Sequence, residues 1–140
     1  MATRGLIRFA KREEGVSFNE HPENVEVQIY NHYDSYPEGL GLQLAEFLSD
    51  FRVVNGLGSG QSKVANGMGC LAAQIVSHFK GDKAGDFYLY APGTRDVGEQ
   101  YIYSIYFTEK TLMIKISNMY NDDESFDGTI DEFGKWLNIV

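Results

Sequence analysis

The sequence predicts an α+β fold, with an antiparallel sheet of about five strands and two or three helices packed on one face. Strand-like runs rich in Val, Ile, Tyr and Phe occupy residues 3–9, 25–33, 86–91, 99–108 and 111–117. Apolar residues repeat at helical spacing in residues 37–50, 63–79 and 130–137. The order ββααβββα indicates an antiparallel sheet covered by helices. The 140 residues have the length of one ordinary domain, so residues 1–140 are expected to form a single domain.

The second predicted strand shows the cleanest alternation between two faces. In VEVQIYNHY, the residues expected to meet the core are Val25, Val27, Ile29 and Tyr33. The residues expected to face outward are Glu26, Gln28, Tyr30 and His32. Later in the chain, a short break at residues 109–110 separates two strand-like runs and predicts a hairpin.

Two of the three predicted helices begin with residues that fit a capping box. Ser35 and Glu38 have the S-x-x-E spacing at the first helix, and Thr129 and Glu132 have the related spacing at the last. The middle helix contains the single cysteine, Cys70, which we expect to be buried. A single cysteine allows no disulfide within the chain and favours a reducing compartment.

The charge and the hydropathy exclude several classes of partner. The formal net charge is −8 at pH 7, which argues against direct binding to nucleic acid and against docking on anionic lipid. No apolar run is long enough to span a membrane, and the first residues lack the apolar stretch of a signal peptide. We therefore expect a cytoplasmic protein. Its charge leaves room for a cationic, metal or protein partner, or for mimicry of a nucleic acid.

The segment HYDSYPEGLG, residues 32–41, joins the second predicted strand to the first predicted helix. If the first two strands pair in a register near Arg4–His32, Arg4 comes within reach of His32 and Asp34. Such a group at a strand end could bind an anion or transfer a proton. The candidate binding residues are therefore Arg4, His32, Asp34 and Tyr36.

A purely structural role explains the same residue types without a ligand. In this interpretation, Arg4 and Asp34 form a surface ion pair. Asp34 or Ser35 then caps the following helix. The segment is in that case a turn whose polar side chains face outward.

This part of the sequence resembles a group of small uncharacterised proteins from bacteriophages and bacterial mobile elements. Those proteins share a HWDGYP or HYDGYP segment behind an N-terminal Thr-Arg. Here TR stands at residues 3–4 and IYNHYDSYPEGLG at residues 29–41, with a later YIYSIY strand. Ser35 stands where that pattern usually has glycine. The resemblance implies a phage-type origin without a mechanism, and it marks Thr3, Arg4, His32, Asp34, Tyr36 and Pro37.

Two other segments match ligand-binding motifs only in part. GLGSGQSK, residues 56–63, has neither Walker A nor dinucleotide-binding spacing and predicts a mobile loop. DESFDGTIDEFG, residues 123–134, has Gly134 where an EF-hand loop needs its bidentate glutamate. We therefore expect no metal site and no cofactor. The weak calcium candidate consists of Asp123, Ser125, Asp127 and Asp131.

Tyrosines crowd the later strands, at Tyr88, Tyr90, Tyr101, Tyr103 and Tyr106. In any register some of them must point away from the helix-covered face. An outer face bearing Tyr30, Tyr106 and Met113 suits an interface, because aromatic residues with a polar tip are enriched there. We therefore predict a homodimer; a plain amphipathic surface is the alternative.

The sequence favours a small phage-type accessory protein without enzymatic activity, which binds a host protein or a small ligand. No group of His, Cys and carboxylate residues has metal-site spacing, and Cys70 has no local activator. The alternative function is a small hydrolase or transferase that uses His32 and Asp34 at the strand-to-helix turn.

Overall fold

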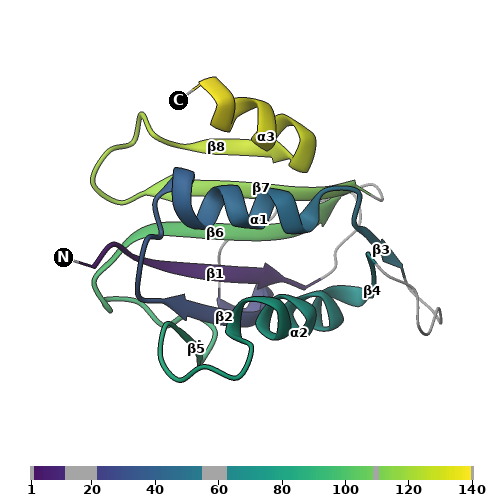
Figure 1. Cartoon of the computed structure of the whole chain (residues 1–140), viewed down its shortest axis with the longest axis horizontal. Coiled ribbons are helices and arrows are strands. Elements are labelled where there is room, and N and C mark those ends of the chain that lie inside the picture. The colour runs from purple at the N-terminus through teal and green to yellow at the C-terminus, as the bar shows by residue number, and fades with distance from the viewer. Residues whose placement is uncertain (1, 12–21, 55–62, 109–110, 140) are drawn as a thin grey trace.

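The computed structural model describes residues 2–11, 22–54, 63–108 and 111–139, and it has the predicted α+β class (Figure 1). Three α-helices cover one face of a six-stranded sheet, and two short strands form a separate pair. The strands are β1 (Arg4–Ala10), β2 (Val25–Asn31), β3 (Arg52–Val54), β4 (Val64–Asn66), β5 (Phe87–Tyr90), β6 (Glu99–Thr108), β7 (Thr111–Asn118) and β8 (Phe126–Thr129). The helices are a 3-10 turn (Pro22–Asn24), a π-helical turn (Pro37–Gly41), α1 (Leu42–Leu48), α2 (Gly67–Lys80) and α3 (Ile130–Ile139).

The main sheet is mixed, so the prediction of a purely antiparallel sheet of about five strands was wrong. Its strand order is β5-β2-β1-β6-β7-β8, and β1 pairs with β6 in parallel while the other neighbours are antiparallel. Alternation identifies a strand but not its neighbour, and β6 joins the sheet beside β1 only after two helices have intervened. The strands β3, β4 and β8, which were not predicted and have three or four residues each, also alter the predicted element order.

The core lies between the sheet and the helices. Figure 1 shows α1 and α2 running in opposite directions on this face, with α2 near β2 and α3 beside β8. The core side chains of the central strands include Ile7, Phe9, Ile29, Tyr103, Ile105, Ile114 and Ile116. Leu44, Leu48, Leu71, Ile75 and Phe133 meet them from the helices. Within the described part of the chain, no helix has the length and apolar character needed to cross a membrane.

The helix-free face of the sheet is partly covered by residues 91–98, which connect β5 to β6. The side chain of Gln28 donates to the carbonyl of Thr94 at 2.8 Å and accepts from the backbone N–H of Gly93 at 3.1 Å. Gln28 and Tyr30 were expected to face outward, yet they are 0% and 5% exposed. The connection causes this difference, because β5 and β6 run in the same direction and the chain must return across β2 and β1.

Of the two predicted capping boxes, one is present in the structure and the other is not. The cap at α3 is confirmed, since Thr129 N–H donates to Glu132 Oε1 at 2.9 Å and Glu132 N–H donates to Thr129 Oγ1 at 3.1 Å. The prediction of a cap at Ser35 and Glu38 is wrong, because the π-helical turn begins without a side-chain cap. Cys70 lies in α2 as predicted but is exposed, which corrects its expected burial.

Candidate functional site

The segment after β2 forms a turn held in place by buried hydrogen bonds. The Asn31 amide donates to the carbonyl of Tyr33 at 2.7 Å and to Ser35 Oγ at 2.8 Å. Ser35, which is fully buried, donates its N–H to the carbonyl of Thr3 at 3.0 Å and accepts at its own carbonyl from the Tyr103 hydroxyl at 2.7 Å. The turn is therefore fixed to β1 and β6, and structure accounts for much of the motif.

A close backbone approach explains the glycine that faces this turn. A Cβ added at Gly5 would lie 2.7 Å from Ser35 Cβ and 3.3 Å from the Tyr101 carbonyl. Asp34 has a φ of 54°, a left-handed conformation that redirects the chain after the strand. Consequently, the side chains of His32 and Asp34 lie on different faces of the molecule.

Two hollows flank the turn. The first, here called the helix-side groove, has a volume of about 1090 Å³ and lies between α1 and α2. Its principal residues are Asp34, Glu46, Phe47, His78, Phe79 and Asp86. The second, here called the tyrosine depression, has a volume of about 700 Å³ and lies on the helix-free face. Its principal residues are Arg4, Tyr30, His32, Tyr88, Tyr90 and Val97.

The helix-side groove has an aromatic floor. The ring of Phe47 lies 4.6 Å from that of His78 and 5.9 Å from that of Phe79, measured between centroids. Phe79 stacks in turn on Phe87 at 5.7 Å. Because these rings come from α1, α2 and β5, only the packed structure assembles the floor.

The walls of the groove are acidic. Asp34, Glu46 and Asp86 are exposed and line it from the turn, from α1 and from the residue before β5. Lys63 is the one lysine or arginine among the described residues that line this groove, and its Nζ donates to the carbonyl of Ser49 at 2.8 Å. The groove therefore presents negative charge above an apolar floor.

The tyrosine depression is built from β2 and β5. Tyr30 stacks on Tyr90 at 5.2 Å with 7° between the ring planes, and Tyr88 lies 5.8 Å from Tyr30. The hydroxyl of Tyr30 and Nδ1 of His32 are 2.7 Å apart. Burial raises the pKa of Tyr30, although the nearby Arg4 lowers it, so the hydroxyl keeps its proton at neutral pH.

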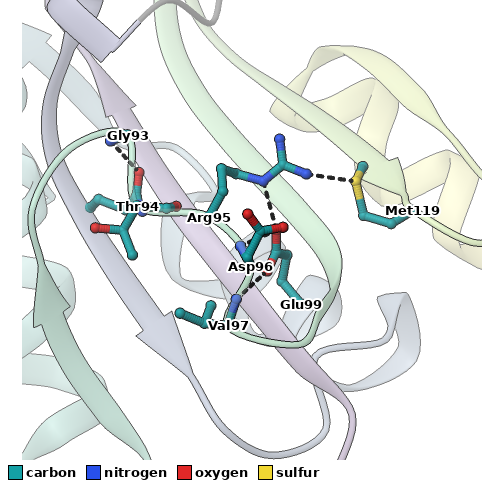
Figure 2. A network of polar contacts seen from close by, with 8 residues as sticks. Gly93, Thr94, Arg95, Asp96, Val97, Glu99 and Met119 are labelled. Atoms are coloured by element: carbon teal, nitrogen blue, oxygen red, sulfur yellow. Dashed lines mark hydrogen bonds and ion pairs between the residues drawn. The ribbon is translucent and has the colours of Figure 1, made fainter.

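The connection of residues 91–98 forms one wall of the depression and has its own polar network. Figure 2 shows Arg95 and the backbone of Val97 directed at the buried carboxylate of Glu99. Arg95 Nε donates to it at 2.6 Å, and the Val97 N–H donates at 2.9 Å. Burial alone would raise the pKa of Glu99, but the hydrogen bonds from Arg95, Val97 and Asp96 outweigh it and lower the pKa.

The structure separates the four predicted binding residues. Arg4 and His32 line the tyrosine depression, in agreement with the expected register, because Gly5 pairs with Asn31. Asp34 lines the helix-side groove, and Tyr36 is exposed and lines neither hollow. Within the described chain, no ion pair joins Arg4 to Asp34.

The enzymatic alternative needs His32 and Asp34 to act together. His32 is hydrogen-bonded to Tyr30, and in the part of the chain that the structure describes no hydrogen bond joins it to Asp34. The two side chains line different hollows. The geometry gives this alternative no support.

Sequence reasoning missed most residues of the two hollows. Phe47 was visible only as one member of an apolar helical stripe, and Glu46 and Asp86 looked like ordinary surface acids. The tyrosine-rich strands were the one signal for Tyr88 and Tyr90, although their pairing with β2 was not foreseen.

Of the two other motif candidates, the glycine-rich segment supplies its last residue, Lys63, to the groove, and the described calcium candidates line neither hollow. Residues 56–62 of the glycine-rich segment lie outside the described residues. Of the calcium candidates, Asp127 lies in β8 and accepts a hydrogen bond from Tyr106, while Asp131 lies in α3. Among the described residues, no group of three or more His, Cys, Asp or Glu side chains is placed to hold a metal ion.

No protein-family model matches the chain, and no curated protein or solved structure shows significant similarity to it.

Proposed function

We propose that this chain is a small interaction protein without enzymatic activity, whose helix-side groove binds a basic segment of a partner protein. The observation that carries the proposal is an aromatic floor beneath three exposed carboxylates, in the larger of the two hollows beside the turn. In keeping with the phage-type resemblance, the proposed partner is a host protein.

The groove is large enough for a segment of chain, because its volume lies at the upper end of the range for small-ligand pockets. Small-ligand pockets usually measure about 300–1000 Å³ and enclose most of their ligand. The groove has about 1090 Å³ and is open along two helices. An extended or helical segment can lie between α1 and α2 and still leave one side in water.

The chemistry of the groove favours arginine or lysine accompanied by an apolar side chain. Apolar and aromatic side chains would bury area on Phe47 and Phe79, which supplies most of the affinity. Exposed ion pairs with Glu46 or Asp86 are each worth up to about 1 kcal/mol, so they contribute mainly selectivity and a faster encounter. An arginine can also stack on a phenylalanine face. The net charge of −8 attracts such a segment from a distance.

A random ten-residue peptide library, selected on the purified chain, tests this function. We expect the enriched peptides to combine Arg or Lys with Leu, Phe or Trp, and to bind less tightly to Glu46→Lys. Asp122→Lys is the matched control, because it makes the same charge change at an exposed residue that does not line the groove. Enriched peptides without basic residues, or equal losses in both variants, would overturn the proposal.

We retain the homodimer as part of the proposal, with a different contact from the one predicted. Tyr30 and Tyr106 are 5% and 8% exposed within one chain, so they have little area left for a partner. Met113 is half-buried on β7, and Met119, just after that strand, is 38% exposed. Sedimentation at tens of micromolar in physiological salt should show a dimer that Met119→Lys weakens; a single monomeric species would contradict it.

The free edge of β5 is a poor place for such a dimer. The hydrogen bond from the His32 N–H to the Asp86 carbonyl means that the backbone groups of Phe87 and Leu89 point away from β2. Lys80 Nζ donates to the Phe87 carbonyl at 3.0 Å, and the Phe87 N–H donates to Gly85 at 2.8 Å. These bonds occupy half of the outward edge, which limits strand addition.

A further inference from the structure

The tyrosine depression has the composition of a second binding site, distinct from the groove. We infer that it binds a small planar aromatic molecule that carries an anionic group. The inference is based on three features of the described residues: a platform of tyrosine rings, an arginine at its rim and a histidine with an available ring nitrogen. It does not depend on the function proposed for the groove.

The platform follows from the pairing of β2 with β5. Tyr30 pairs with Tyr88, and Gln28 pairs with Tyr90, so all three tyrosines lie on the helix-free face. Tyr30 is 5% exposed and is held by its stacking on Tyr90 and its bond to His32, whereas Tyr88 is 45% exposed. The Tyr88 ring is tilted by 48° from that of Tyr30, and Lys80 Nζ lies over it at 5.6 Å from its centroid, so a planar ligand would stack on the other face of Tyr88.

The polar groups at the rim favour an anion. Arg4 is exposed, and its Nη1 donates to the Val97 carbonyl at 3.3 Å, which holds the guanidinium beside the tyrosines. A guanidinium has five N–H donors, so others remain for a carboxylate, sulfonate or phosphate. When the Tyr30 hydroxyl donates to Nδ1 of His32, the neutral ring carries its proton on Nε2, which is a further donor.

The surrounding charge restricts the ligand to a small one. Asp86 also lines the depression, and the chain has a net charge of −8. A nucleic acid strand would bring many phosphates against this acidic surface, whereas a single anionic group can lie beside Arg4. We therefore infer a mononucleotide-like or aromatic-acid ligand and not a polymer.

Calorimetric titration with pairs of probes that share a ring system and differ in charge tests the inference. One pair is AMP and adenosine, and the other is naphthalene-2-sulfonate and naphthalene-2-sulfonamide, with inorganic phosphate as a separate arm. We expect at least one anionic aromatic probe to bind about three- to fivefold more tightly than its uncharged partner, the scale of one exposed ion pair. Phosphate alone should bind more weakly than either anionic aromatic probe, because it has no ring to stack.

Variants locate the binding. Tyr88→Ala should weaken the anionic aromatic probe by roughly five- to a hundredfold, the range measured for loss of one stacking ring. Tyr120→Ala is its control, since Tyr120 is 74% exposed and does not line the depression. Arg4→Gln should remove the preference for the charged probe, whereas Arg52→Gln, an exposed arginine on β3, should not.

Three further results would decide against the site. No binding of any aromatic probe at millimolar concentration would overturn the inference, as would binding that Tyr88→Ala leaves unchanged while the variant melts at the parent temperature. Binding of the probe should change the NMR chemical shifts of Tyr88 and Tyr90. Shifts confined to Phe47 and Phe79 would assign the binding to the groove and would also overturn it.

Discussion

The helix-side groove and the tyrosine depression lie on opposite faces of the same turn, yet they differ in almost every property. The groove combines phenylalanine rings with carboxylates and lies between two helices. The depression combines tyrosine rings with Arg4 and His32 and lies against the open face of the sheet. One short stretch of chain thus supplies residues to two hollows, which also share Tyr33 and Asp86.

The contrast shows how a change in backbone direction divides a motif. In a continuous strand, His32 and Asp34 would share one face, because alternate residues point the same way. The strand ends at Asn31, and Asp34 has a φ of 54°. His32 therefore joins the tyrosines, while Asp34 joins the acidic wall of the groove. The spacing of His32 and Asp34 in the sequence therefore could not predict that they line different hollows.

Gly5→Val should have the largest effect, because it disturbs the turn that both hollows share. The added Cβ would meet buried Ser35 at 2.7 Å, and the neighbouring strands leave no room for adjustment. We expect the free energy of unfolding to fall by about 3 kcal/mol, measured by urea titration. Both binding activities should weaken together.

Gly69→Ala is the control for this substitution. Its Cβ would meet only Glu26 Oε1 at 4.0 Å, and helix propensity should raise stability by up to about 1 kcal/mol. If Gly5→Val were as stable as the parent protein, the turn could not be the shared support of the two hollows.

Glu99→Gln should affect the depression and leave the groove intact. The substitution removes the negative charge that accepts hydrogen bonds from Arg95 Nε and the Val97 N–H. We expect the free energy of unfolding to fall by about 1–2 kcal/mol at pH 7. Because folding lowers the pKa of Glu99, its stabilisation is present above the unfolded pKa and is lost as pH falls through the folded value. Urea titrations at several pH values should show a flatter acid limb in the variant.

The exposed Glu38→Gln provides the comparison, since it removes a carboxylate that does not line either hollow. An unchanged acid limb in Glu99→Gln would mean that the connection of residues 91–98 is not held by this carboxylate.

Glu46→Lys should act on the groove alone. A lysine at this wall replaces attraction with repulsion, so a selected basic peptide should bind about tenfold more weakly at low salt. The difference from the parent protein should shrink as salt increases, because both charges are exposed. Calorimetry at two salt concentrations measures it. An equal loss of affinity for the aromatic anion probes would remove the distinction between the two hollows.

Thr129→Ala should have the smallest effect and should leave both hollows unchanged. It removes the hydroxyl that caps the first turn of α3, and such a cap contributes about 1 kcal/mol to the free energy of unfolding. Thermal unfolding should show the loss, while peptide and probe affinities stay at the parent values. Altered affinities would indicate that the two surfaces are coupled to α3.

The sequence by itself determined the local elements of this protein. Periodicity located β1, β2, β5, β6, β7 and the three α-helices, because residues that alternate or repeat at helical spacing keep that relation in any fold. The cap at Thr129 and Glu132 was equally visible, since both partners lie within one turn of the chain. The pairing of β1 with β2 in a register near Arg4–His32 was only a condition in the sequence analysis, and the structure meets it by pairing Gly5 with Asn31.

Only the tertiary structure decided which of these elements meet. The parallel contact of β1 with β6 and the burial of Gln28 under residues 91–98 depend on segments far apart in the chain. The floor of the groove likewise brings Phe47 together with Phe79 from another helix. Such contacts leave no local pattern, because burial and charge pairing at long range are properties of the packed surfaces and not of neighbouring residues.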